Sequence, residues 1–115
     1  MFNKMTPRRG FIQMCFITAV SDEEFHPQEM AAIISVLEKN GFSESEAEKE
    51  FKYFAKLSPR KAFEYGAEAM RAVLELDSNM KKKLLESMKE IALADGKVDP
   101  QEEILYNTTK MAFGY

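Results

Sequence analysis

The chain has 115 residues, of which 45% are hydrophobic, 11% aromatic and 30% charged, a composition that excludes a disordered protein and fits a single domain with a hydrophobic core. The net charge is −3, from 16 basic and 19 acidic residues, and this balance argues against a general nucleic-acid-binding protein. Only five glycines and four prolines interrupt the chain, which favours long helices over many short strands.

The first 20 residues combine basic residues with an apolar stretch, as a targeting signal would. This stretch is too short to span a bilayer, Gln13 interrupts it, and no small-residue cleavage site follows it. We therefore expect a buried core helix at this place. Cys15, the single cysteine, cannot form an intrachain disulfide and is expected to be a buried thiol in a reducing cytoplasm.

Residues typical of helix starts and helix ends recur along the chain. In no segment do apolar and polar residues alternate with the period of two that a half-buried strand shows. The first predicted helix, residues 10–20, is apolar on nearly every face, as expected of a helix that others surround. Further helices are predicted to begin at Pro27, after Ser43, at Ser58-Pro59, at Asp77-Ser78 and at Asp99-Pro100. The sequence predicts one all-α domain over residues 1–115, a compact bundle of about six helices, with a loose segment at 1–9.

Apolar residues recur at steps of three and four within these helices, so each helix is expected to turn one face inward. The helix that begins at Pro59 is expected to carry its inward stripe on Phe63, Met70, Val73 and Leu74. The lysines at 81–83 cannot all face the same way on one helical turn, and we interpret them as a solvated face.

The chain also contains an internal repeat, in which residues 19–29 match residues 92–102 without a gap. The identical pairs are Ala19 and Ala92, Asp22 and Asp95, Pro27 and Pro100, Gln28 and Gln101, and Glu29 and Glu102. Each copy is an acidic corner that joins the end of one helix to the start of the next. The repeat predicts two related helix–turn–helix halves with pseudo-two-fold symmetry.

Two such corners in a small helical chain resemble the tellurite-resistance TerB family, whose domain also occurs in DnaJ-like membrane co-chaperones. The resemblance covers residues 10–113, and its most specific part is ADGKVDPQEE at 94–103. The first corner departs from the usual form, because Glu23 stands where a glycine is expected.

The resemblance implies an all-helical, cytoplasmic or membrane-associated domain that is not an enzyme and is linked to tellurite and other chemical stress. It also implies metal binding by the acidic residues of the two corners. In this chain those positions are Asp22, Glu29, Asp95 and Glu102.

The spacing within the second corner excludes a complete EF-hand. If Gly96 is the sixth residue of the loop, Glu102 is the twelfth, but the first and third ligand positions fall on apolar Ile91 and Leu93. Two half-loops brought together by symmetry would still place four carboxylates in one region, where they favour Ca²⁺, Mg²⁺ or Mn²⁺. A zinc site is not expected, since His26 is the only histidine.

Helix capping explains some of the same residues without a ligand. Asp99 as the N-cap, Pro100 as the first helical residue and Glu102 as the third form a capping box. Capping leaves Asp22 and Asp95 unexplained, because an acid at the C-terminal end of a helix opposes the helix dipole. Two interpretations remain open: a cation-binding domain, and a protein-interaction scaffold in which the corner acids only cap helices.

No catalytic residue is expected, because the chain has no nucleophile elbow, no phosphate-binding glycine loop and no dinucleotide fingerprint. A protein partner is expected, since several of the eight methionines lie on helical stripes, where they either line a groove or fill the core. The basic residues near the start leave docking on a membrane surface open. Residues 111–115 are a candidate for self-association, which would make a homo-oligomer.

The capping box generates a stability prediction. Asp99→Ala should lower the free energy of unfolding by about 1 kcal/mol, with or without a divalent cation, because the last helix loses its N-cap. Chemical denaturation of both proteins measures the difference. An unchanged free energy would mean that this helix begins elsewhere.

Overall fold

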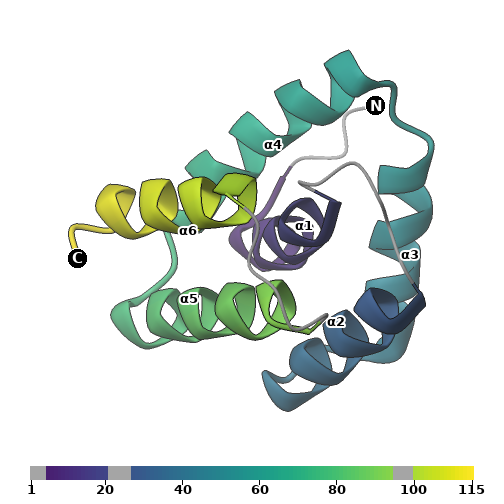
Figure 1. Cartoon of the computed structure of the whole chain (residues 1–115), viewed down its shortest axis with the longest axis horizontal. Coiled ribbons are helices and arrows are strands. Elements are labelled where there is room, and N and C mark those ends of the chain that lie inside the picture. Colours follow the sequence, from purple (N-terminus) through teal and green to yellow (C-terminus); the bar gives the residue numbers. More distant parts are fainter. Residues whose placement is uncertain (1–4, 21–26, 95–99) are drawn as a thin grey trace.

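The burial of one apolar helix organises the fold. The computed structural model describes residues 5–20, 27–94 and 100–115, and its first helix is α1 (Pro7–Val20). Every residue from Gly10 to Phe16 is buried. Each of the other five helices of the described chain contacts α1, which lies at the centre of the molecule (Figure 1). An apolar surface on all sides of α1 is thereby removed from water, as its sequence predicts.

Five helices surround α1 in the described chain, and no strand accompanies them. They are α2 (Pro27–Lys39), α3 (Glu44–Ala55), α4 (Pro59–Val73), α5 (Ser78–Ala92) and α6 (Pro100–Ala112). The prediction of an all-α bundle is confirmed. The first helix begins at Pro7, earlier than the predicted Gly10, because the Thr6 hydroxyl accepts a hydrogen bond from the Arg9 backbone N–H at 3.1 Å and Pro7 suits the first helical position. Arg8 and Arg9 of this first turn pair with glutamates of α3.

Local capping chemistry sets several helix boundaries. The side chains of Ser43, Ser58 and Asp77 accept hydrogen bonds from the backbone N–H groups of Glu46, Lys61 and Met80, at 3.1, 3.2 and 2.8 Å. These bonds satisfy backbone donors that a helix start leaves unpaired. Gly41 follows the end of α2 with a φ of 89°, a left-handed conformation that glycine adopts without strain. The predicted starts of α3, α4 and α5 are confirmed.

The most extensive helix–helix contact of α1 is with α4, and it includes a close approach at Gly10. A Cβ atom at Gly10 would lie 3.0 Å from Cγ1 of Val73 and 3.1 Å from the carbonyl oxygen of Ala69. Only a residue without a side chain allows the two backbones to approach this closely. Gly10 therefore fixes how α4 lies across the central helix.

A partly buried polar cluster ties α1 to α3 and α4. Arg9 Nε donates a hydrogen bond to Glu50 Oε2 at 3.0 Å, and Gln13 Nε2 donates to Glu50 Oε1 at 2.8 Å. The Arg9 guanidinium also donates to the hydroxyl of Tyr65. Burial raises the pKa of Tyr65 to about 12, although the nearby charge of Arg9 opposes that shift. The phenol therefore stays neutral at physiological pH and accepts the bond from Arg9.

The predicted inward face of α4 is wrong at two positions. Phe63 is 81% exposed and Leu74 is 41% exposed. The face that packs inward instead carries Tyr65, Ala69, Ala72 and Val73, all of which are buried. The close contact at Gly10 and the bond from Arg9 to Tyr65 select this face. They leave Phe63 at the surface.

Cys15 is fully buried within α1, as predicted for a core thiol. Burial raises the pKa of its thiol far above the usual value, because an apolar environment disfavours the thiolate. Among the described helices, none combines the length and the apolar character that crossing a membrane requires.

The buried cluster and an exposed ion pair should differ in their contribution to stability. Glu50→Ala leaves Arg9 and Gln13 without their shared acceptor, and should lower the free energy of unfolding by about 3 kcal/mol. Glu90→Ala is the matched control, because it removes the Lys39–Glu90 pair, in which both side chains are about half exposed or more (62% and 48%).

The control should cost less than about 1 kcal/mol, since solvent screens exposed pairs. Chemical denaturation of both variants measures the two values. Equal losses in the two variants would contradict a structural role for the Arg9–Glu50 cluster.

Candidate functional site

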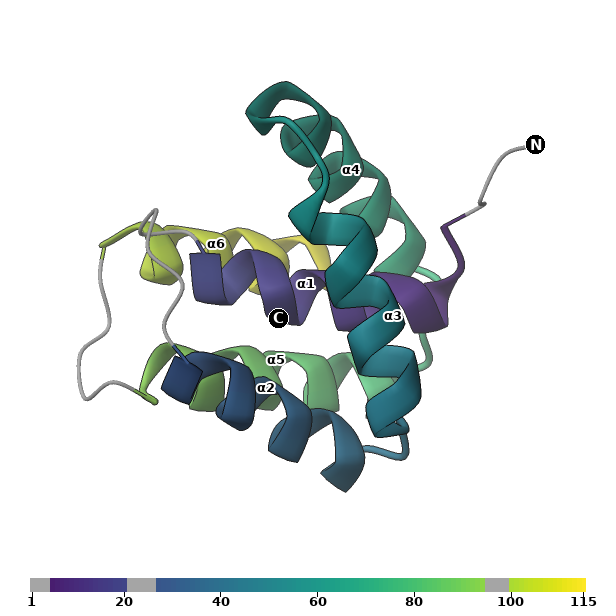
Figure 2. The same cartoon turned by 90° about the vertical axis from the view of Figure 1, so that its right-hand side faces the viewer.

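The helix ends that carry the two acidic corners converge in space. The first corner joins α1 to α2, and the second joins α5 to α6. Figure 2 shows the C-terminal ends of α1 and α5 and the N-terminal ends of α2 and α6 on one side of the molecule, at the left of that view. The contacts agree with the view, since α1 and α5 each contact both α2 and α6. Helix ends that are far apart in the sequence therefore lie on the same side of the molecule.

Of the four predicted site residues, the structure describes the side chain of one. Asp22 and Asp95 lie outside the described residues. Glu29 lies in the first turn of α2, and its side chain also falls outside the description. Glu102 lies in the first turn of α6 and is buried, with 7% of its surface exposed.

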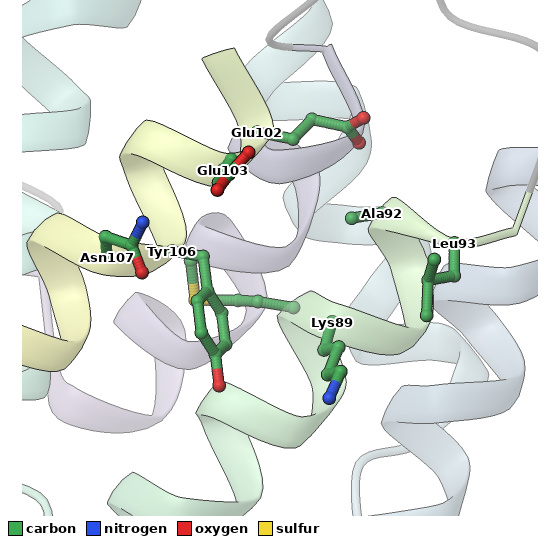
Figure 3. A pocket seen from close by; sticks show the side chains of 8 residues that line it. Lys89, Ala92, Leu93, Glu102, Glu103, Tyr106 and Asn107 are labelled. Atoms are coloured by element: carbon green, nitrogen blue, oxygen red, sulfur yellow. The ribbon is translucent and has the colours of Figure 1, made fainter. Parts of the chain in front are cut away.

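The burial of Glu102 distinguishes it from an ordinary surface acid. Glutamate is almost never fully buried unless its charge is balanced by a partner. The next residue, Glu103, is exposed, and Figure 3 shows the two side chains pointing in different directions. The N-terminal end of α6 favours a negative charge in its first turn, because unpaired N–H groups concentrate positive charge there. The helix end therefore offsets part of the cost of burying a carboxylate at this position.

A hollow of about 240 Å³ lies between α5 and α6 beside Glu102 (Figure 3). Its walls are mainly apolar, and they come from Met88, Ala92, Leu93 and Tyr106. Lys89, Glu103 and Asn107 add polar groups at its edge. This volume is below the range of roughly 300–1,000 Å³ typical of sites for small organic ligands. The hollow is therefore too small for a typical organic ligand and sits next to the acidic corner.

Sequence reasoning did not find the residues of this hollow. Glu103, Tyr106 and Asn107 are spaced by three and four positions, which places them on neighbouring parts of one helical surface. That spacing is visible in the sequence, but it does not indicate that Lys89 of α5 lines the same hollow. Only the packing of α5 against α6 brings the two sets together.

A protein-family model described as "Tellurite resistance protein TerB" matches residues 8–114. The chain belongs to the TerB family. The matched region contains all of the corner residues and nearly the whole chain, so the resemblance seen in the sequence is confirmed. No curated protein and no solved structure matches the chain significantly.

The described part of this TerB domain holds one of the predicted ligands in a defined environment. Among the side chains that the structure describes, which exclude that of Glu29, no group of three or more His, Cys, Asp or Glu is placed to hold a metal ion. Any cation site that includes Glu102 would therefore take further ligands from residues 20–29 and 95–99. Those ranges contain the other three predicted acids.

Proposed function

We propose that this TerB domain is a non-enzymatic module of the response to tellurite or related chemical stress, which binds a divalent cation between its two acidic corners. The observation that carries the proposal is the convergence of the helix ends that flank both corners (Figure 2). If the two corners lay far apart, their acids could not share a cation and would serve only as helix caps. The family description supports the link to tellurite.

The donor set suits a hard cation. Asp22 and Glu29 from the first corner and Asp95 and Glu102 from the second would supply only carboxylate oxygens. Such ligands favour Ca²⁺, Mg²⁺ or Mn²⁺ over metals that prefer sulfur or nitrogen. Ionised carboxylates in one region repel each other strongly, and a bound cation would offset that repulsion.

The same charges argue against tellurite itself as the ligand. Tellurite is an oxyanion, and carboxylates together with a net charge of −3 would repel it. In this proposal the domain responds to a cation, and the cation connects α1 and α2 to α5 and α6. Binding would then be coupled to stability, because a ligand that binds only the folded state stabilises that state.

The proposal predicts a cation-dependent melting temperature. Chelator-treated protein titrated with Ca²⁺, Mg²⁺, Mn²⁺ and Zn²⁺ should show a saturable rise with at least one of the hard cations. A cation at 100 times its dissociation constant adds about 2.7 kcal/mol, which corresponds to a rise of roughly 10 °C for a domain of this size. Differential scanning fluorimetry measures the shift.

Two variants test where the cation binds. Asp95→Asn combined with Glu102→Gln should abolish the shift, because the second corner then has no ionised ligand. Glu103→Gln is the matched control, since it removes an exposed charge next to Glu102, and it should keep the shift. No shift with any of the four ions up to millimolar concentrations would contradict cation binding and leave the acids as caps.

A further inference from the structure

A second and more apolar hollow lies among α1, α4 and α6. Its volume is about 310 Å³, and every side chain that lines it is uncharged. Met14 and Ile17 of α1 form its floor, and Gly66 and Met70 of α4 and Leu105 of α6 form its walls. The cation site proposed above uses none of these residues.

An unusually exposed aromatic side chain stands beside this hollow. Phe63 of α4 lines the hollow, yet 81% of its surface is exposed. On α6, Ile104 and Met111 are also exposed, by 64% and 76%. Those two residues do not line the hollow, whereas Phe63 does. Single exposed apolar residues are common, but an exposed phenyl ring at the edge of an apolar hollow is typical of a binding surface.

We propose that this surface pairs with a second copy of the same chain, with Phe63 of each copy entering the hollow of the other. A two-fold axis uses the same patch on both copies, so a projecting side chain next to a hollow is self-complementary. The size also fits. An apolar cavity of about 150 Å³ is known to hold benzene, so the hollow of about 310 Å³ has room for a phenyl ring.

The charges on α4 are self-complementary in the antiparallel arrangement that a two-fold axis produces. Arg60 and Lys61 stand in the first turn of α4, and Glu64 and Glu68 follow. If two α4 helices cross near Phe63, Arg60 of each copy comes within reach of Glu64 or Glu68 of the other. Attractive pairs then form on both sides of the axis.

Within the chain, Arg60 and Lys61 form only long, exposed ion pairs with Glu64. Arg60 and Glu64 are 90% and 51% exposed, and their closest atoms are 3.7 Å apart. Lys61 lies 3.9 Å from the same carboxylate. Exposed pairs at such distances contribute little, so the side chains are available for a second copy. This order of charges favours a self-association over a partner of uniform charge.

The contact is expected to be weak and dependent on concentration. One aromatic side chain buries about 150–250 Å², whereas a stable interface buries about 800 Å² on each partner. Sedimentation velocity of the 115-residue chain from about 1 µM to about 1 mM covers the range of weak complexes. The chain should change from monomer to dimer within this range.

Phe63→Ala should raise the dimer dissociation constant at least about tenfold, because it removes the central apolar contact. Its melting curve should stay unchanged, since Phe63 is 81% exposed in the single chain. Tyr115→Ala is the matched control: it truncates another exposed aromatic residue that does not line the hollow, and dimerisation should persist. A wild-type chain that stays monomeric, or a dimer that tolerates Phe63→Ala, would overturn the proposal.

Charge-reversal variants distinguish pairing of two copies of this chain from binding of a different partner at this surface. Arg60→Glu should weaken the dimer, and so should Glu64→Arg combined with Glu68→Arg, because each homodimer then juxtaposes like charges. A mixture of the two variants should form a heterodimer at least as readily as the wild type dimerises, since every pair across the axis is again of opposite sign. A mixture that associates no better than either variant alone would contradict the antiparallel α4 pairing.

Discussion

Burial of α1 on all sides is the constraint on which the rest of the structure depends. A helix that is apolar on nearly every face must be surrounded, and the five other described helices supply that cover. Gly10 allows α4 to approach closely, and the Arg9–Glu50 pair orients α3. Helices α1 and α5 lie side by side and end on the same side of the bundle, where α2 and α6 begin (Figure 2).

Features that depend on local chemistry could be predicted, and features that depend on packing could not. The starts of α3, α4 and α5 follow from caps at Ser43, Ser58 and Asp77, whose partners are within three residues. The exposure of Phe63 could not be predicted, because periodicity shows that α4 has an apolar stripe but not which side faces α1. The contact with Gly10 decides that side.

The same distinction applies to the candidate site. The sequence identifies Glu102 as a corner acid, but a helix-start glutamate serves equally as a cap, a partner of the helix dipole or a ligand. Its burial, in contrast to exposed Glu103, results from the packing of α6 and is invisible in the repeat. Helix α6 also connects the two proposals, since Glu102 belongs to the acidic corner and Leu105 lines the hollow beside Phe63. A cation that holds the start of α6 in place would also hold Leu105 in its position beside the hollow.

The most direct test of a cation shared by both corners is a titration of isotope-labelled protein with Mn²⁺, followed by paramagnetic broadening of amide signals. One equivalent should broaden Ala19 and Met30 beside the first corner together with Ala92 and Gln101 beside the second. Asp77, at the opposite end of α5 and about 20 Å away along the helix, should be affected least. Broadening at only one corner, or none that saturates at one equivalent, would contradict a site built from the two converging corners.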